Sequence, residues 1–437
     1  MLLLFKPWEY IKPKIWFNKT PLQIFKNIIL SLMVFYFIVL YRSIRCHFLN
    51  TLVDMGMNKI LINSLGIQDS GGVVVFSHLL DEIKNTSYKF LIVCNGSRLV
   101  SILVEQYKEY RNLKFIVLKH KSLVYRLYYE NIHFKSLIKS NNIQLIYNFS
   151  GSAQLNFLMN TLQLIKVHNL LFYSRNLDAV YHSKTAYFEW LKQVFLKRLY
   201  FKFMLNQSKY IEVQSNHVQD CLSNFIDTKN KNFYEKSDID VCNDAFSLPR
   251  KYDFSKKIKF LYIVGPHFEF IHKNFITFVN ALTAFDRLNI DYEINITLTK
   301  DQLYNSEIWD SALDSKTNYL GYIDSQDEMN KLFCSNTILI STSIIETLGL
   351  HVIEGIKNGV ITIAPNESYA RIVYGDNMNL YDTLNSDSLL NAIQVVLNSD
   401  SPHSELILSL QDRLKKSEMA KHHNILNIFK EVLNVQK

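Results

Sequence analysis

Short apolar runs alternate with amphipathic segments from about residue 58 onward. The runs are typical of buried strands, and the segments between them are typical of helices that cover a sheet. In the first half the expected strands are KILINSL from Lys59, YKFLIVCN from Tyr88, LKFIVLK from Leu113, IQLIYNF from Ile143, NLLFYS from Asn169 and YIEVQS from Tyr210. In the second half they are KIKFLYIVG, EINITLT, TNYLGYI, TILISTS and VITIA. This alternation predicts an α/β protein with parallel sheets.

The distribution of proline predicts where the chain divides. No proline occurs from residue 22 to 248, and Pro249 lies in the charged and polar stretch 227–257. We therefore expect two Rossmann-like, doubly wound domains that face a cleft, with a helical extension at the N-terminus. The expected parts are an extension over 1–57, a first domain over 58–250, a second domain over 251–400 and C-terminal helices over 401–437.

The extension carries the apolar run NIILSLMVFYFIVLY, preceded by Lys6, Lys12, Lys14, Lys19, Trp8 and Trp16. As a helix these 15 residues extend about 22 Å, less than the roughly 30 Å of a hydrocarbon core. If the helix begins at Leu22, a single span is possible. An interfacial anchor fits the flanking charge and tryptophan equally well, and a helix buried against the first domain is a third interpretation. We expect membrane contact.

Composition and charge narrow the function classes. The 437 residues are 48% hydrophobic and 20% charged, which is an ordinary globular profile. Five cysteines without a CxxC pair indicate neither a disulfide framework nor a zinc site, so a reducing, cytosolic location is expected. Residues 1–250 contain 31 Lys and Arg against 17 Asp and Glu, and the remainder contains 17 against 23. With the apolar extension beside it, the basic half favours anionic lipid over nucleic acid as a partner.

Ligands of open α/β domains bind beyond the carboxyl ends of the strands, so the turns that follow strands are the candidate sites. The first such turn is Asp69-Ser70-Gly71-Gly72, where paired glycines allow close approach of a ligand to the backbone. A tight turn without a ligand is the alternative. The second is GPHFEFIHKNF, from Gly265, with a helix expected from about Asn274. Lys273 opposes the dipole of that helix unless an anion binds there; a solvent-exposed lysine is the alternative.

The third turn, ETLGLHVIEG, seats two carboxylates around a glycine. Glu346 follows the strand TILISTS, and Leu350 begins a short helix that carries Glu354 and ends at Gly359. A carboxylate accepts two hydrogen bonds from vicinal hydroxyls, and the free amides near Gly349 suit a phosphate. Two acids beside such amides indicate a site for a nucleotide sugar.

This stretch resembles the Glu-x7-Glu motif of retaining glycosyltransferases of family 4, which have the GT-B fold. The resemblance extends to HKNF, LGYIDSQDEMNKLF and NGVITIAP in the second half, and to DSGG, SRNLDAV and VQSNHVQDCL in the first. It implies that the first domain faces the acceptor and that the second binds the nucleotide sugar. Asp238-Ile239-Asp240 spells the metal-binding DxD of another glycosyltransferase fold, but it lies in the polar linker.

The resemblance implies roles for individual residues. Lys273 would bind the diphosphate, Glu346 would contact the donor sugar, and Arg175 would contact the acceptor or a phosphate unless it forms a surface salt bridge. The donor-binding residues would be Glu354 at the ribose, together with Gly349, Leu350, Gly71, Gly72, Gly265 and His267. Many members of the family carry an arginine shortly after the position of Gly265, where this chain has Pro266-His267. His351 stands where proline is frequent, and we interpret it as a capping or packing residue.

The function expected from the resemblance is transfer of a sugar from a nucleotide sugar to a saccharide or lipid-linked acceptor with retention of configuration. It implies synthesis of bacterial surface polysaccharide at the cytoplasmic face of the inner membrane. Neither a metal nor another cofactor is expected, nor nucleic acid as a partner. A sugar-nucleotide epimerase of the same fold and an inactive nucleotide-sugar-binding scaffold are the alternatives.

Overall fold

The structure is a computed structural model that describes residues 59–67, 70–119, 123–155, 161–239, 246–323, 325–399 and 403–434. The prediction of a membrane-associating extension over 1–57 lies outside these residues, as do Asp69 and Asp240. Within the described residues no helix combines the length and the apolar character needed to cross a membrane.

The first sheet consists of seven parallel strands in the order β3-β2-β1-β4-β5-β6-β7. Its strands are β1 (Lys59–Ser64), β2 (Lys89–Asn95), β3 (Leu113–Leu118), β4 (Leu145–Asn148), β5 (Leu162–Val167), β6 (Tyr210–Val213) and β7 (Asn232–Glu235). In the register, Ile62 of β1 lies beside Ile92 on one side and Tyr147 on the other. The order reverses between β1 and β4, as in a doubly wound fold.

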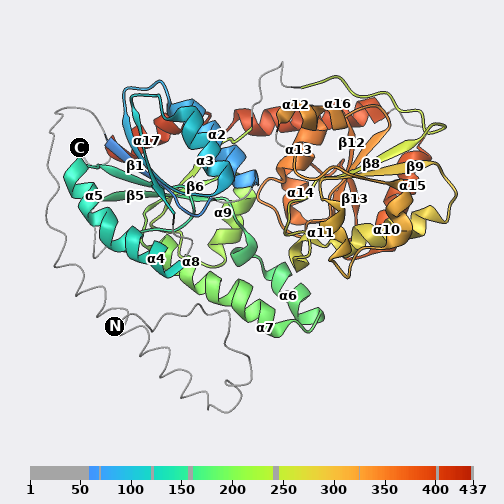
Figure 1. Ribbon diagram of the computed structural model, residues 1–437, viewed down its shortest axis with the longest axis horizontal. Helices are drawn as coiled ribbons and strands as arrows, with labels where there is room; N and C mark the ends of the chain where they lie inside the picture. The colour runs from blue at the N-terminus through green and yellow to red at the C-terminus, as the bar shows by residue number, and fades with distance from the viewer. Residues whose placement is uncertain are drawn as a thin grey trace, which may run out of the picture.

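The second sheet repeats this plan with six parallel strands in the order β10-β9-β8-β11-β12-β13. Its strands are β8 (Ile258–Tyr262), β9 (Tyr292–Ile296), β10 (Thr317–Tyr319), β11 (Thr337–Ile340), β12 (Ile361–Pro365) and β13 (Asn379–Tyr381). Two doubly wound domains lie side by side in Figure 1, which confirms the predicted fold class.

Helices cover both sheets, and each domain has its own core. The first domain contains α2 (Ser70–Ile83), α3 (Arg98–Tyr107), α4 (Leu123–Tyr128), α5 (Phe134–Asn141), α6 (Arg175–Ser183), α7 (Tyr187–Trp190), α8 (Leu196–Asn206) and α9 (Asn216–Ser223). The second contains α10 (Phe275–Asp286), α11 (Lys300–Tyr304), α12 (Gln326–Leu332), α13 (Leu350–Lys357), α14 (Ser368–Val373) and α15 (Ser386–Leu397), followed by α16 (His403–Met419) and α17 (Ile425–Asn434).

One predicted strand is wrong. NLLFYS forms a single 3-10 turn at Leu171–Tyr173, and the strand is β5, immediately before it. β5 contains Gln163 and Lys166, both fully buried, so its sequence lacks the apolar run of a buried strand. A buried strand can contain Lys166 because a buried lysine is tolerated when carboxylates pair with it. The expected glycine turn also differs, because α2 already begins at Ser70 and takes Gly71 and Gly72 into its first turn.

The C-terminal helix α17 packs against the first domain, far from the second domain that precedes it in sequence. Ile425, Ile428, Phe429 and Val432 are fully buried in the core formed around β1 and β4. The ring of Phe429 lies 5.2 Å from that of Tyr147. Figure 1 shows α16 running along the upper edge of the molecule toward the first domain, where α17 docks. Each fully buried side chain of this kind contributes about 1.5–3 kcal/mol, so α17 ties the two domains together.

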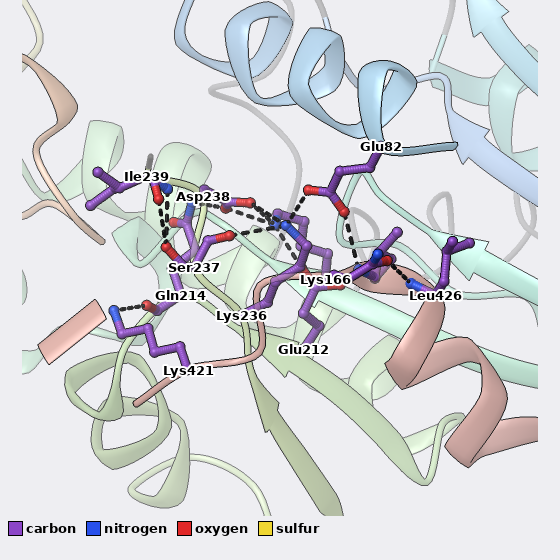
Figure 2. A network of polar contacts seen from close by, with 12 residues as sticks. Glu82, Lys166, Glu212, Gln214, Lys236, Ser237, Asp238, Ile239, Lys421 and Leu426 are labelled. Carbon is purple, nitrogen blue, oxygen red and sulfur yellow. Dashed lines mark hydrogen bonds and ion pairs between the residues drawn. The ribbon is translucent and has the colours of Figure 1, made fainter. Parts of the chain in front are cut away.

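A buried network of charges lies where these segments meet (Figure 2). Lys166 Nζ lies 2.7 Å from both Glu212 and Asp238. Lys236 Nζ lies 2.7 Å from Glu82 of α2, whose other carboxylate oxygen accepts a hydrogen bond from the backbone of Ile425. Burial lowers the pKa of Lys166, but the two carboxylates outweigh burial and raise it overall. The network therefore joins β5, β6 and the segment after β7 to α2 and the start of α17.

We predict that Lys166→Met strongly destabilises the protein. Removing the central cation leaves the buried Glu212 without an ion-pair partner among the described residues and leaves Asp238 with only the more distant Lys236 at 3.5 Å, which costs about 3–5 kcal/mol. Urea unfolding followed by circular dichroism should show a lower midpoint. Lys416→Met is the matched control, because Lys416 pairs with Asp412 on the surface and is 76% exposed. Equal midpoints for the two variants would contradict the importance of the network.

Candidate functional site

A cavity of about 690 Å³ lies between the carboxyl edges of the two sheets. It opens at the points where the strand order of each sheet reverses, where doubly wound domains bind ligands. The first domain lines it with residues that follow β1, β4, β5 and β6, including Gly71, Gly72, Phe149, His168 and Gln214. The second domain lines it with residues that follow β8 and β11, including Gly265, Lys273, Glu346, Gly349, Leu350 and Glu354. The three predicted turns therefore meet in one cavity.

An ion pair between Lys273 and Glu346 lies in the wall of this cavity. Lys273 Nζ is 2.7 Å from Glu346 Oε1 and 3.5 Å from Ser343 Oγ. The two loops are fixed by their backbones: Thr342 Oγ1 donates to the carbonyl of Lys273, and Ile344 N donates to the carbonyl of His272. Burial alone raises the pKa of Glu346, but the Lys273 ammonium outweighs it and lowers the pKa to about 2. An ammonium has three donors, so Lys273 can hold Glu346 and a further anion together.

The start of α13 presents backbone amides to the same cavity. Gly349 precedes the helix with φ +62°, and a Cβ at this position would collide with the hydroxyl of Tyr374. That hydroxyl donates to the carbonyl of Leu348 at 2.8 Å, which holds the turn. First-turn amides have no partner within a helix. Because α2 also begins at the cavity, two positive helix ends meet there, an arrangement that favours an anion.

Glu354 lines the cavity one turn into α13, in an environment unlike that of Glu346. Burial raises the pKa of its carboxyl, and among the described residues no donor forms a hydrogen bond with that carboxylate. Glu346 is held ionised by a lysine at 2.7 Å, whereas Glu354 has no such ion pair among the described residues, and the effect of burial on its pKa exceeds that of the nearby Lys357. An unpartnered carboxylate in a cavity is well placed to accept hydrogen bonds from ligand hydroxyls.

Three further residues of the cavity were not assigned a ligand from the sequence. His168 directly follows β5, and its buried Nδ1 has no hydrogen-bond partner within the described residues; burial, together with Lys166, lowers its pKa to about 4. Gln214 donates to Asp238 at 2.6 Å, and its Oε1 is similarly unpartnered among those residues. His351 lies 2.9 Å from Ser341 Oγ, and burial lowers its pKa to about 4. Each of the three is a polar residue at the end of a buried strand or at the start of a helix. This position indicates a site residue, but it is recognised only when the strands are assigned correctly.

Two predicted site residues lie apart from the others. The ring of His267 is exposed and stacks on that of Phe270, with centroids 5.0 Å apart. Arg175 is exposed at the start of α6, with its guanidinium 5.9 Å from the ring of Phe225. Neither is among the described residues that line the cavity. Gly265 does line it, and a Cβ there would meet open space.

The only acid of the DxD sequence that the structure describes, Asp238, belongs to the buried network and pairs with Lys166. Across the described residues, no three side chains of His, Cys, Asp or Glu come together in a group that could hold a metal ion.

The sequence matches no protein-family model and no curated protein. Solved structures resemble the chain over most of its length. HepE of Anabaena, crystallised with UDP and glucose, is 10% identical and superposes with a TM-score of 0.59 over 87% of this chain and 99% of its own. A variant of Staphylococcus aureus TarM, crystallised with UDP, fondaparinux and alpha-GlcNAc-glycerol, is 13% identical, with a TM-score of 0.56 over 86% and 100%. A Listeria monocytogenes protein described as a UDP-N-acetylglucosamine 2-epimerase is 11% identical, with a TM-score of 0.50 over 83% and 91%.

The chain has the GT-B fold. The two sheets, their strand orders and the cleft between them all belong to this architecture. At these identities the likeness establishes the fold, and chemistry has to be argued from the site itself.

We predict that Gly349→Ala lowers stability while Gly71→Ala leaves it nearly unchanged. The first adds a Cβ at φ +62° against the hydroxyl of Tyr374, whereas a Cβ at Gly71 meets nothing within 4 Å. The strained backbone costs on the order of 1–3 kcal/mol. Thermal unfolding of both variants provides the comparison, and an unchanged midpoint for Gly349→Ala would show that the turn relaxes freely.

Proposed function

We propose that this protein is a retaining glycosyltransferase that moves a sugar from a nucleotide-sugar donor to a saccharide or lipid-linked acceptor. The observation that carries the proposal is the cavity in which the Lys273–Glu346 pair, the carboxylate of Glu354 and two helix N-termini meet. Cations and amides suit a diphosphate, and the two carboxylates suit the hydroxyls on either side of it.

The donor lies across α13 in this proposal. Glu354 accepts hydrogen bonds from the ribose hydroxyls, and the amides at Gly349 and Leu350 bind the diphosphate together with Lys273. Glu346, held in place by Lys273 at 2.7 Å, faces the donor sugar from one side, and His168 with Gln214 faces it from the first domain. HepE and TarM, which share the fold, were both crystallised with UDP, and this supports a donor of that class.

The protein's contribution to catalysis is electrostatic. As the bond between the sugar and the diphosphate breaks, negative charge develops on the leaving phosphate oxygen. Lys273 and the helix amides stabilise that charge without moving, because Glu346 and the loop backbones already hold them. One such preorganised donor is worth about 3–4 kcal/mol. The acceptor oxygen bonds to the same face of the sugar, and its proton passes to the leaving phosphate.

A sugar-nucleotide epimerase is the second candidate, supported by the shared fold of the Listeria protein. Two histidines with lowered pKa values, His168 and His351, lie in the cavity, and neutral imidazoles can exchange protons with a bound sugar. Incubation with a panel of nucleotide sugars separates the possibilities. Mass spectrometry and NMR reveal transfer to an acceptor, isomerisation of the donor, or neither, as for an inactive nucleotide-sugar-binding scaffold.

We further propose that the enzyme works at the cytoplasmic face of the bacterial inner membrane, in the synthesis of surface polysaccharide. The support is the sequence of 1–57, with its apolar run after lysine and tryptophan, and the basic charge of the first half. Family 4 membership and independence of metals are part of the same proposal.

We predict that Glu354→Ala weakens donor binding and that Glu346→Ala mainly lowers turnover. Loss of charge-assisted hydrogen bonds costs about 1.5–3 kcal/mol, roughly 10- to 150-fold. Calorimetry with UDP measures the first effect and initial rates measure the second. Glu431→Ala, at an exposed position of α17, is the control and should change neither. Unaltered UDP affinity in the Glu354 variant would exclude the ribose assignment.

We also predict that the product keeps the anomeric configuration of the donor and that EDTA leaves activity intact. Lys273 and the amides of α13 can neutralise the diphosphate in place of a metal. Proton NMR of the product, with and without the chelator, tests both parts. An inverted linkage, or activity that requires a divalent cation, would show that these roles are wrongly assigned.

A further inference from the structure

Helices α7 and α8 carry a stripe of exposed apolar side chains. Six of the nineteen exposed large apolar residues in the described parts of the chain fall within 187–203, each between 41% and 77% exposed. They are Tyr187, Phe188, Leu191, Leu196, Leu199 and Phe203. A five-residue π-helical segment joins the two helices, so that 187–206 forms one rod. Most successive exposed positions are three to five residues apart, close to one helical turn, so they lie along one side of that rod.

The opposite side of the rod is already packed and paired. Val194 is fully buried beside Leu177 and Tyr181 of α6. Arg198 forms two hydrogen bonds of 2.9 Å with Asp178, which also accepts from Trp190 Nε1. The apolar and polar groups of this inner side are therefore packed and hydrogen-bonded within the domain. The exposed stripe is a separate surface of the rod and is not the side that forms the core. Contiguous exposed apolar surface of this kind marks an interaction site.

The charge around the stripe identifies the partner. Residues 184–206 contain five basic side chains and a single acid, Glu189. Lys184, Lys192 and Lys202 are exposed and have no acidic partner among the described residues. An apolar stripe flanked by lysines is the pattern of a helix that lies in the interface of an anionic bilayer, with the lysine stems reaching up to the headgroups.

The position of the rod relates it to the cavity. Trp190 of the rod and Ile271 of the second domain, two residues before Lys273, both pack against the small cluster of Leu177, Tyr181 and Val194. Figure 1 shows α6 and α7 along the lower edge of the molecule, near the junction of the two domains. The stripe is thus close to the loop that carries a principal cation of the candidate site.

We propose that 187–203 is a membrane-docking helix that seats in the surface of an anionic bilayer, separately from the extension over 1–57. Docking on this side brings the junction of the two domains to the lipid headgroups. If the proposed transferase function holds, a lipid-linked acceptor can reach the cavity without leaving the membrane. The docking surface itself depends only on the stripe and its lysines.

Photo-crosslinking of the full-length protein to vesicles locates the contact. The vesicles contain phosphatidylcholine with roughly 30 mol% phosphatidylglycerol, which gives the bilayer a negative surface potential, and a trace of phosphatidylglycerol with a photoactivatable acyl chain. Peptide mass spectrometry should find crosslinks within 187–203, in addition to any within 1–57. Crosslinks confined to 1–57 would overturn the proposal.

Variants measure the contribution of the stripe. Leu196→Ser with Leu199→Ser should lower the vesicle partition coefficient about tenfold, and Lys192→Glu with Lys202→Glu should do so on anionic vesicles only. Val395→Ser with Leu408→Ser is the apolar control, with similar exposure on α15 and α16. Lys256→Glu with Lys430→Glu is the charge control. All variants should retain the wild-type unfolding midpoint.

Three results separate this proposal from its rivals. Unchanged partition of the leucine variant would overturn it. A dimer in lipid-free solution that the leucine variant dissociates would assign the stripe to a second copy of the chain and also overturn it. Failure of the proposed function is a separate outcome: no turnover of any nucleotide sugar, with crosslinks within 187–203 still present, would leave the docking surface standing.

Discussion

The cavity depends on the buried charge network around Lys166, because that network fixes Gln214 in the cavity wall and joins β5 and β6 to α2, which also contributes to the wall. Lys166 on β5 binds Glu212 and Asp238, and Asp238 in turn fixes the amide of Gln214 at the end of β6. Lys421, between α16 and α17, donates to the carbonyl of Gln214 at 2.7 Å. The same charges therefore orient the cavity's polar groups and fasten the segment that returns from the second domain (Figure 2). Buried charges require such complete pairing, since any one left alone is costly.

The cavity wall formed by the second domain contains two carboxylates in different electrostatic environments. Glu346 lies against Lys273 and has its pKa lowered, whereas Glu354 has its pKa raised by burial and forms no ion pair within the part of the chain that the structure describes. Two carboxyl groups whose pKa values are shifted in opposite directions within one cavity are expected where a ligand presents different chemical groups at its two ends. The backbone amides at the start of α13 lie between the two acids and provide a positive electrostatic field. A diphosphate flanked by two sets of hydroxyls matches this sequence of charges.

The sequence alone predicts most of the cavity wall that the second domain contributes and little of the wall that the first domain contributes. In ETLGLHVIEG the strand end, the left-handed glycine and the helix are consecutive, so local rules place Glu346 and Glu354 together, and the structure does the same. In the first domain, β5 contains a buried lysine whose partners are 46 and 72 residues away. No local pattern indicates that pairing. The sequence therefore predicts the strand at NLLFYS, and it gives no signal for His168 as a site residue. Likewise, the packing of α17 against β1 and β4 follows from tertiary contacts alone.

The rod of α7 and α8 connects these two walls to a surface. Its inner side is held by Asp178 and contributes Val194 to the small cluster on which Ile271 packs, and Ile271 lies in the 3-10 turn that ends at Lys273. Its outer side exposes apolar residues that no described segment covers. A sequence such as WLKQVFLKRLYFKF is compatible with a core helix that has a basic edge, but the structure buries Val194 on the inner side and leaves Leu191, Leu196, Leu199 and Phe203 exposed on the outer side. Since one rigid element shares a buried cluster with the cation-bearing loop and also exposes this stripe, a partner bound to the stripe would fix the direction from which an acceptor approaches the cavity.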